Sequence, residues 1–421
     1  MSEYVDEFIA LIRNDDPLSK GPALRLGLII MFAAIAVLCI CFAFIPMLKY
    51  TLVTPSVSPG WYGRDYDADQ NTRGSLTDLI NTGTSGITLD TPMTQLSVAT
   101  ANYGGIYTED SGFFGLNPWI GHVDPDVVRL QIEAGARAVV FDIWPDPANP
   151  AIPVVCAMKD SNEWGSISWW RNNGINKGVG KYSNWQLLTR NKVPATDMIN
   201  MACTTAFGAL APNVQTNDPF FLILRLHGAM TVDYLNYLGN AVKAALGTHR
   251  MPTQWDKMQN QSAICSAKVS DFMQSGFVIV SPDIQPSYNI LPNTNTMDGF
   301  ITLYRNTVMG EVTNALDTTV NPVFFDLGTL DAIASATQPA CASGQGSQTP
   351  AQAGFCVVQP TIGGKTSDNT KQIGLSNFQK ARQVGAQMVA VNYFSQNNGD
   401  DVMTAVFDPA LFGKYSFKKG A

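Results

Sequence analysis

From residue 96 onward, short apolar runs alternate with stretches of helical periodicity. The apolar runs have the length and character of buried parallel strands. The most distinct are AVVFDIW (138–144), FFLILRLH (220–227), GFVIVSP (276–282), NPVFFDLG (321–328) and AQMVAVNYF (386–394). Residues 231–246, which follow the second run, carry apolar side chains at helical spacing. This order predicts an α/β fold with a parallel sheet. The pattern alone leaves open whether the sheet is a closed barrel or an open, doubly wound sheet.

A longer apolar segment lies near the N-terminus. Residues 26–48 read LGLIIMFAAIAVLCICFAFIPML and carry no charge. At about 1.5 Å per residue, a helix of this length spans a hydrocarbon core of about 30 Å. A cleaved signal peptide is the alternative, but the polar segment 1–25 precedes the apolar run and no clean cleavage site follows it. We therefore expect one retained transmembrane helix, with the lipid bilayer as its partner.

The charges around this segment bear on its orientation. Lys20 and Arg25 precede the apolar run and Lys49 follows it. This slight excess of positive charge favours a single-pass protein whose N-terminus is cytoplasmic or internal. The residues that come next, 49–95, are rich in Thr, Ser, Gly, Asp and Pro, and we expect a linker or irregular arm there.

Composition excludes some functions. The net charge is −7 and only 14% of the residues are charged, so no basic field is present to hold nucleic acid. The cysteines form no CxxC pair and no Cys/His cluster, so they give no sign of a metal site, and no cofactor is expected. Cys341 and Cys356 bracket a Gly/Ser/Gln-rich stretch, where a disulfide and two separate thiols both remain open.

Several motifs resemble the phosphoinositide-specific phospholipase C family. GARAVVFDIWP (135–145) and FFLILRLHG (220–228) resemble two segments of the family's X half. Residues 375–407 and the final GKYSFKK (413–419) resemble its Y half. The resemblance implies one TIM-type (β/α)8 barrel, with the X half in residues 96–285, the Y half in 355–421 and a connection in 286–354. That connection is expected to contain some structured segments.

The resemblance also implies where catalytic residues would lie. The family's reaction needs a general base and a general acid, both histidines. In LSVATANYGG (96–105), Ala101 stands at the first histidine and Asn102 at a metal-binding asparagine. In residues 153–157, Ala157 stands at the second histidine. Because alanine transfers no proton, no catalytic residue is expected, and the resemblance implies a pseudoenzyme.

The metal site implied by the resemblance is degenerate as well. Asp142 keeps the family's aspartate, but Val140 and Arg225 stand where the family has glutamates. Calcium needs several oxygen ligands, so these two changes should exclude a divalent cation. We expect Arg225 to pair with Asp142 instead.

Three further positions complete the expected site. Ser281 stands at a phosphate-binding lysine and Phe378 at a sugar-stacking tyrosine, which puts substrate binding in doubt. His227 matches a family position beside the site, and a histidine on a buried strand is more often a hydrogen-bonded core residue than a base. His122 is expected in a turn and His249 past the end of a helix.

Three functions remain open at this stage. The first is a membrane-anchored, inactive barrel with a structural or interaction role among protein partners. Phospholipase-like barrels occur in large DNA viruses as well as in cells, so this protein would suit a minor capsid component that tethers an inner virion membrane to a shell. The second is a phosphodiester hydrolase or lyase with a rearranged site that uses His227. The third is a lipid or inositol phosphate binding protein, with Arg225 and Lys159 as phosphate contacts.

Overall fold

The computed structural model describes two units of the chain, Met1–Ser56 and Val57–Ala421. The described residues are 27, 29–37, 73–108, 121–160, 185–208, 214–228, 231–252, 267–282, 303–304, 323–326, 356–359, 373–383, 385–393, 406 and 411–420.

In the first unit, the described residues are helical and their large apolar side chains are exposed. Among the residues described, no helix has both the length and the hydrophobicity needed to cross a membrane. The transmembrane helix expected over residues 26–48 is therefore not supported, and much of that segment lies outside the described residues.

In the described part of the second unit, the main sheet has eleven strands, and eight of them pair in parallel along one path. They are β1 (Leu96–Ala101), β4 (Ala138–Pro145), β9 (Phe220–Leu226), β10 (Gly276–Pro282), β11 (Leu303–Tyr304), β12 (Val323–Asp326), β13 (Cys356–Gln359) and β14 (Met388–Val391). The five apolar runs identified in the sequence all contain one of these strands.

The strand order is consistent with a barrel. Neighbouring strands follow the order β11-β10-β9-β4-β1-β14-β13-β12, so the first of the eight parallel strands pairs with the last. In that pairing Val98 lies opposite Met388 and Ala101 opposite Val391. The expected neighbours from the X-like and Y-like halves are therefore confirmed, and the fold is consistent with a (β/α)8 barrel. A closed barrel would also pair β11 with β12, and that pairing is not seen among the described residues.

Two of these strands fall in the segment expected to connect the halves. Strands β11 and β12 both lie within residues 286–354, so this segment contributes to the sheet. Cys341 lies outside the described residues, and of Cys356 only the backbone is described, at the start of β13.

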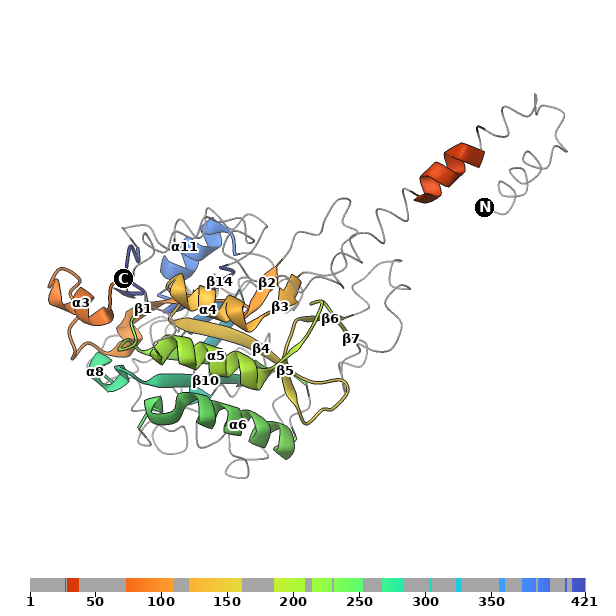
Figure 1. Cartoon of the computed structure of the whole chain (residues 1–421). Coiled ribbons are helices and arrows are strands. Elements are labelled where there is room, and N and C mark those ends of the chain that lie inside the picture. Colours follow the sequence, from red (N-terminus) through yellow and green to blue (C-terminus); the bar gives the residue numbers. More distant parts are fainter. Residues whose placement is uncertain are drawn as a thin grey trace, which may run out of the picture. The chain divides into compact units, whose positions relative to one another are not determined.

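Helices cover the outer face of the sheet. They are α4 (Pro125–Glu133), α5 (Ala195–Phe207), α6 (Val232–Leu246) and α11 (Leu375–Gln383). Figure 1 shows α4, α5 and α6 in succession, and α5 contacts both of the others. Helix α6 begins where its sequence predicts, because the Thr231 hydroxyl caps it by accepting from the Tyr234 amide at 3.1 Å.

Smaller elements complete the unit. They are α3 (Leu76–Asn81), the short 3-10 helices η2 (Met93–Gln95) and η7 (Gly247–His249), α8 (Val269–Phe272), and the strands β2 (Ile106–Thr108), β3 (Gly121–Val123), β5 (Pro153–Val155), β6 (Met158–Asp160), β7 (Trp185–Leu187), β8 (Val193–Pro194) and β15 (Phe417–Lys419). Strand β15 pairs antiparallel with β1, β2 with β3, and β6 with β7.

Alternation along the strands divides the core in two. On β4, Val139 and Phe141 pack in the cluster shared with α4, α5, α6 and α11. Ala138 and Val140 belong to a second cluster that contains no residue of those helices. We refer to this second cluster as the inner core. Asp142 has the same parity as Val140, so it continues the inner face toward the carboxyl end of the strand.

The arm before the first strand is more ordered than its composition predicts. Within residues 49–95, expected to be irregular, α3 buries Leu76 and Leu79 in the inner core. Asp218 holds the helix in place by accepting from the Leu76 amide at 2.8 Å. Sequence analysis missed this helix because its six residues are too few to show helical periodicity.

Candidate functional site

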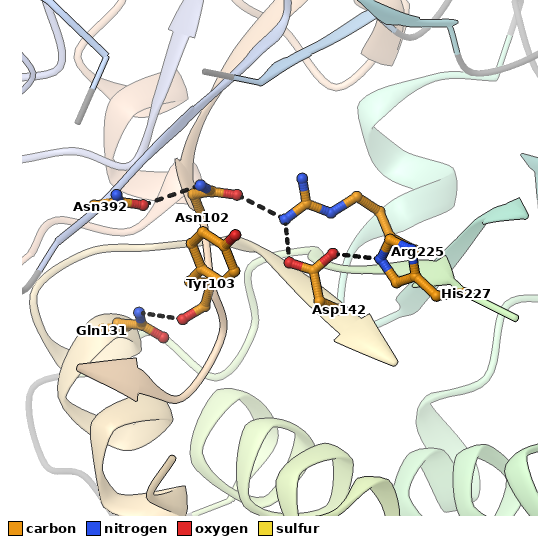
Figure 2. A network of polar contacts seen from close by, with 7 residues as sticks. All are labelled: Asn102, Tyr103, Gln131, Asp142, Arg225, His227 and Asn392. Carbon is orange, nitrogen blue, oxygen red and sulfur yellow. Dashed lines mark hydrogen bonds and ion pairs between the residues drawn. The ribbon is translucent and has the colours of Figure 1, made fainter. Parts of the chain in front are cut away.

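The inner face of the sheet ends in a buried network of polar side chains (Figure 2). Asp142 on β4 and Arg225 on β9 are register partners on adjacent strands, so their side chains extend from the same level of the sheet. Nη2 of Arg225 donates to Oδ2 of Asp142 at 2.6 Å. The expected ion pair between them is thus confirmed.

The same guanidinium nitrogen reaches the end of β1. Nη2 of Arg225 also donates to Oδ1 of Asn102 at 2.9 Å. The amide of Asn102 in turn donates to Oδ1 of Asn392, just past β14, at 3.0 Å. Four neighbouring strands, β9, β4, β1 and β14, therefore contribute consecutively to one network, as Figure 2 shows.

His227 extends the network on the other side of the carboxylate. Its Nε2 lies 2.7 Å from Oδ1 of Asp142, so both carboxylate oxygens are engaged. The imidazole stacks on Trp144, with ring centroids 4.0 Å apart and planes 7° from parallel. The exposed fraction of His227 is 1%, which confirms the expected hydrogen-bonded core histidine.

The turn after β1 packs against the guanidinium. Tyr103 adopts a left-handed φ of 49°, and Cζ of Arg225 lies 5.7 Å from the centroid of its ring. Gln131 on α4 fastens this turn by donating to the Tyr103 carbonyl at 3.2 Å and accepting from the Gly105 amide at 3.1 Å. Burial, followed by the nearby charge of Asp142, raises the pKa of Tyr103 well above its usual value. The phenol therefore stays neutral.

The network is closed to solvent. Arg225 has an exposed fraction of 0% and Asp142 of 4%. In such surroundings a guanidinium and a carboxylate stabilise each other only if both keep their hydrogen bonds. Nη2 of Arg225 and both carboxylate oxygens of Asp142 are engaged in this way, through Asn102 and His227. The arrangement neutralises charge and joins strands, and it offers no exposed acid or base.

Two of the predicted site positions face away from this network. Ala101 and Ala157 both pack in the cluster between strands and helices. Ala101 precedes Asn102 in an extended chain, and successive side chains of a strand point to opposite faces. At the second position Cys156, rather than Ala157, shares a cluster with Trp144. Burial, then the charge of Asp142, raises the pKa of the Cys156 thiol.

The other predicted positions are distributed differently. Val140 lies in the inner core, below Asp142 on the same strand face, as expected. Ser281 is the register partner of Arg225 on β10, although its side chain lies outside the described residues. Phe378 does not join the site. It lies on α11 and packs in the cluster between the sheet and the outer helices, called the outer cluster below.

The remaining histidines have structural contacts. His122 lies in β3, not in the expected turn, and its ring is tilted against Tyr107 with centroids 5.4 Å apart. His249 ends η7 just after α6, as expected, and its Nδ1 lies 2.9 Å from the Gln274 carbonyl oxygen. It also stacks on Phe207 at 4.4 Å.

The donor set does not fit a calcium ion. Calcium takes six to eight oxygen ligands. Here Oδ1 of Asn102 and Oδ2 of Asp142 both accept from one nitrogen of Arg225, and Val140 contributes only carbon. A fixed positive charge thus stands among the oxygens that a metal would need.

Sequence reasoning missed Asn392, Trp144 and Gln131 as members of the site. Asn392 has the parity of Met388 and Ala390, which belong to the inner core. Trp144 follows Asp142 by two residues, so both side chains leave β4 on the same face. The alternation of side chains, continued past the carboxyl end of each strand, is therefore the signal that could have identified Asn392 and Trp144.

Comparison with known proteins gives structural neighbours only. No family model and no curated protein matches the sequence. Solved structures similar to this chain include phospholipases C and a glycerophosphodiester phosphodiesterase from Parabacteroides distasonis. PLC21 from L. pealei is 10% identical, with a TM-score of 0.49, over 80% of this chain and 38% of that one. PLC21 from S. officinalis is 10% identical, with a TM-score of 0.46, over 76% of this chain and 36% of that one.

A bacterial neighbour matches over nearly its whole length. The calcium-dependent phosphoinositol-specific phospholipase C from Pseudomonas sp is 9% identical, with a TM-score of 0.39, over 79% of this chain and 97% of that one. By contrast, this chain spans little more than a third of the two PLC21 proteins.

Proposed function

We propose that this protein is a catalytically inactive, phospholipase C-like barrel with a structural or interaction role at a membrane. The observation that carries the proposal is the position of Arg225, whose guanidinium lies between Asn102 and Asp142. Family resemblance assigns those two residues to a metal site. A side chain fixed by the protein itself now supplies the positive charge there, and it cannot exchange or polarise a substrate as a metal does.

Burial supports the absence of acid–base chemistry. A general base must come within hydrogen-bond reach of a substrate proton. His227 is 1% exposed, stacked on Trp144 and hydrogen-bonded to Asp142. Its surroundings leave no described route for a substrate hydroxyl to reach the ring.

The contact between His227 and Asp142 favours one alternative function. An imidazole oriented by a carboxylate is a common general-base pair, so a hydrolase or lyase with a rearranged site is the competing proposal. Such an enzyme would have to open the network, because both carboxylate oxygens of Asp142 are already engaged. The inactive barrel requires no such rearrangement.

We further propose that residues 26–48 anchor the protein in a lipid bilayer. The described part of this segment is helical and exposes Ile29, Ile30 and Val37 by 51%, 58% and 57%. Consecutive exposed apolar side chains on a helix are unfavourable in water and favourable in lipid. In a virion, an anchored barrel of this kind would join an inner membrane to a capsid shell through protein partners.

An activity assay separates the inactive barrel from the enzyme. The full chain, in mixed micelles of detergent and phosphatidylinositol or its phosphates, is expected to release no inositol phosphate. Should turnover occur, His227→Ala tests the alternative, with His249→Ala as a matched control on the surface. Turnover that His227→Ala abolishes and His249→Ala preserves would establish the enzyme and refute the inactive barrel.

The anchor and the partners need a separate measurement. The full chain should remain with native membranes or particles after alkaline carbonate extraction, and a variant lacking residues 26–48 should be released. Cross-linking in the native material should then join the barrel to protein neighbours. A full chain that carbonate extracts completely, or a barrel without protein cross-links, would contradict the corresponding part of the proposal.

A further inference from the structure

A second arginine, in a different part of the fold, has no acidic partner among the described residues. Arg382 is in the last turn of α11, and its Cζ lies 5.6 Å from the centroid of the Phe412 ring. Its Nε and Nη1 atoms are buried, and neither has a hydrogen-bond partner in the described part of the chain. A guanidinium carries five N–H donors and no acceptor, so these buried atoms can be satisfied only by an acceptor from elsewhere.

Two fully buried arginines, Arg225 and Arg137, show how such a charge is usually satisfied. Arg225 donates to Asp142 and Asn102. Arg137 donates to the backbone carbonyls of Ala206 and Gln215. Buried charged groups are normally paired in this way because an unpaired one is strongly destabilising. Arg382 is partly exposed, but its buried Nε and Nη1 atoms have no such acceptor among the described residues.

The electrostatic surroundings of Arg382 agree with its geometry. Burial lowers its pKa from the usual 12.5 to about 10, and no acidic side chain of the described residues offsets this effect. For Arg137, by contrast, the charge of Asp218 opposes the effect of burial on the pKa. Arg382 thus remains a cation at neutral pH without a counter-charge from the described chain.

A small cavity adjoins this guanidinium. It lies between α11 and strands β1 and β14, and Thr100, Phe378, Gln387 and Phe412 line it together with Arg382. Its volume of about 10 Å³ has room for one water-sized group. The Thr100 hydroxyl donates to the Val98 carbonyl at 2.8 Å, and the Gln387 amide donates to the Thr94 carbonyl at 2.9 Å. Arg382 is therefore the charged donor that the cavity presents to an incoming group.

We propose that this cavity is an anion site that takes one oxygen of a carboxylate or phosphate group. The oxygen would accept from Arg382, and the rest of the oxyanion would lie at the opening, where solvent reaches. Guanidinium groups bind both oxyanions strongly because charge assists the hydrogen bonds. The site is separate from the buried network around Arg225 and does not depend on the proposed function.

Thermal unfolding of the full chain in detergent tests the site. Inorganic phosphate, acetate and chloride are compared at constant ionic strength and pH 7. Phosphate or acetate at about ten times its dissociation constant should raise the Tm by roughly 2 °C. Arg382→Met should lose this rise, whereas Lys380→Met, which removes the same charge from the same helix, should keep it.

The outcomes distinguish a phosphate site from a carboxylate site. A rise with phosphate alone identifies a phosphate site, and a rise with acetate alone identifies a carboxylate site. Three results would overturn the proposal. The Tm of Arg382→Met could rise as much as that of the unmodified chain, chloride could raise the Tm as much as the oxyanions do, or neither oxyanion could raise it. If Arg382→Met does not fold, Arg382→Lys serves in its place, because it keeps the charge but loses the planar donor pair and should show a smaller rise.

Discussion

Removing one member of the pair between Arg225 and Asp142 should destabilise the fold more than removing both charges. The side chains of Arg225 and Asp142 are 0% and 5% exposed, and Nη2 of Arg225 lies 2.6 Å from Oδ2 of Asp142. Breaking a buried pair leaves an uncompensated charge and costs about 3–5 kcal/mol, whereas replacing both partners is often close to neutral. We therefore expect Arg225→Met and Asp142→Asn each to cost about 3 kcal/mol or more, with a coupling free energy of at least about 2 kcal/mol.

Urea unfolding of the full chain in detergent, followed by tryptophan fluorescence, measures this coupling in a double-mutant cycle. A partly exposed pair on α4 provides the control: Arg129 Nη1 lies 2.7 Å from Oε1 of Glu133, with side chains 28% and 12% exposed. For Arg129→Met and Glu133→Gln we expect about 0.3–0.5 kcal/mol. A coupling for the buried pair no larger than that of the α4 pair would refute the reasoning.

Three further predictions concern other parts of the fold. Burial raises the pKa of Asp218 from 3.8 to about 6. The folded state therefore binds the proton more tightly than the unfolded state does. As the pH rises from about 4 to 6, the free energy of unfolding should fall by roughly 3 kcal/mol relative to that of Asp218→Asn. A flat difference between the two proteins in pH-dependent unfolding would contradict this. Leu76→Ala should cost about 2–5 kcal/mol, since Leu76 is 1% exposed in the inner core, whereas Leu89→Ala, at a residue 50% exposed, should change stability by under about 0.5 kcal/mol. Similar losses in denaturant unfolding would mean that the packing of α3 on the inner core does not stabilise the fold. Calorimetry should detect no calcium binding, and a micromolar affinity that vanishes in Asp142→Ala would show that the ion displaces Arg225.

The pairing of Arg225 with Asp142 could be predicted from the sequence because both residues lie in long apolar runs that resemble the phospholipase C motifs, and the resemblance places both at one metal site. In such runs the strand and its facing parity are clear, and two charges of opposite sign at the same level of adjacent strands have no better partner. The neighbourhood of β1 and β14 was predictable because both segments resemble motifs of the phospholipase C family. Local pattern supplied the strands and their parity, and the resemblance supplied which strands are neighbours.

Other features depend on contacts that no local pattern reveals. Ala101 was matched to a family position letter by letter, but the extended backbone turns its side chain toward the helices. Phe378 was placed at the site, although α11 directs it to the outer cluster. The short helix α3 owes its position to Asp218, which lies 142 residues away in the sequence. Long-range hydrogen bonds of this kind can be recognised only once the fold is known.

The shared use of one guanidinium nitrogen by Asp142 and Asn102 constrains how this barrel could change in evolution. A single substitution, Arg225→Glu, would place two carboxylates side by side in a buried space, and like charges there repel strongly. Only a simultaneous gain of a metal, and of a further oxygen ligand in place of Val140, would relieve that repulsion. Sequences between the present network and a metal site would thus be less stable than either end point, so single substitutions do not easily convert one arrangement into the other.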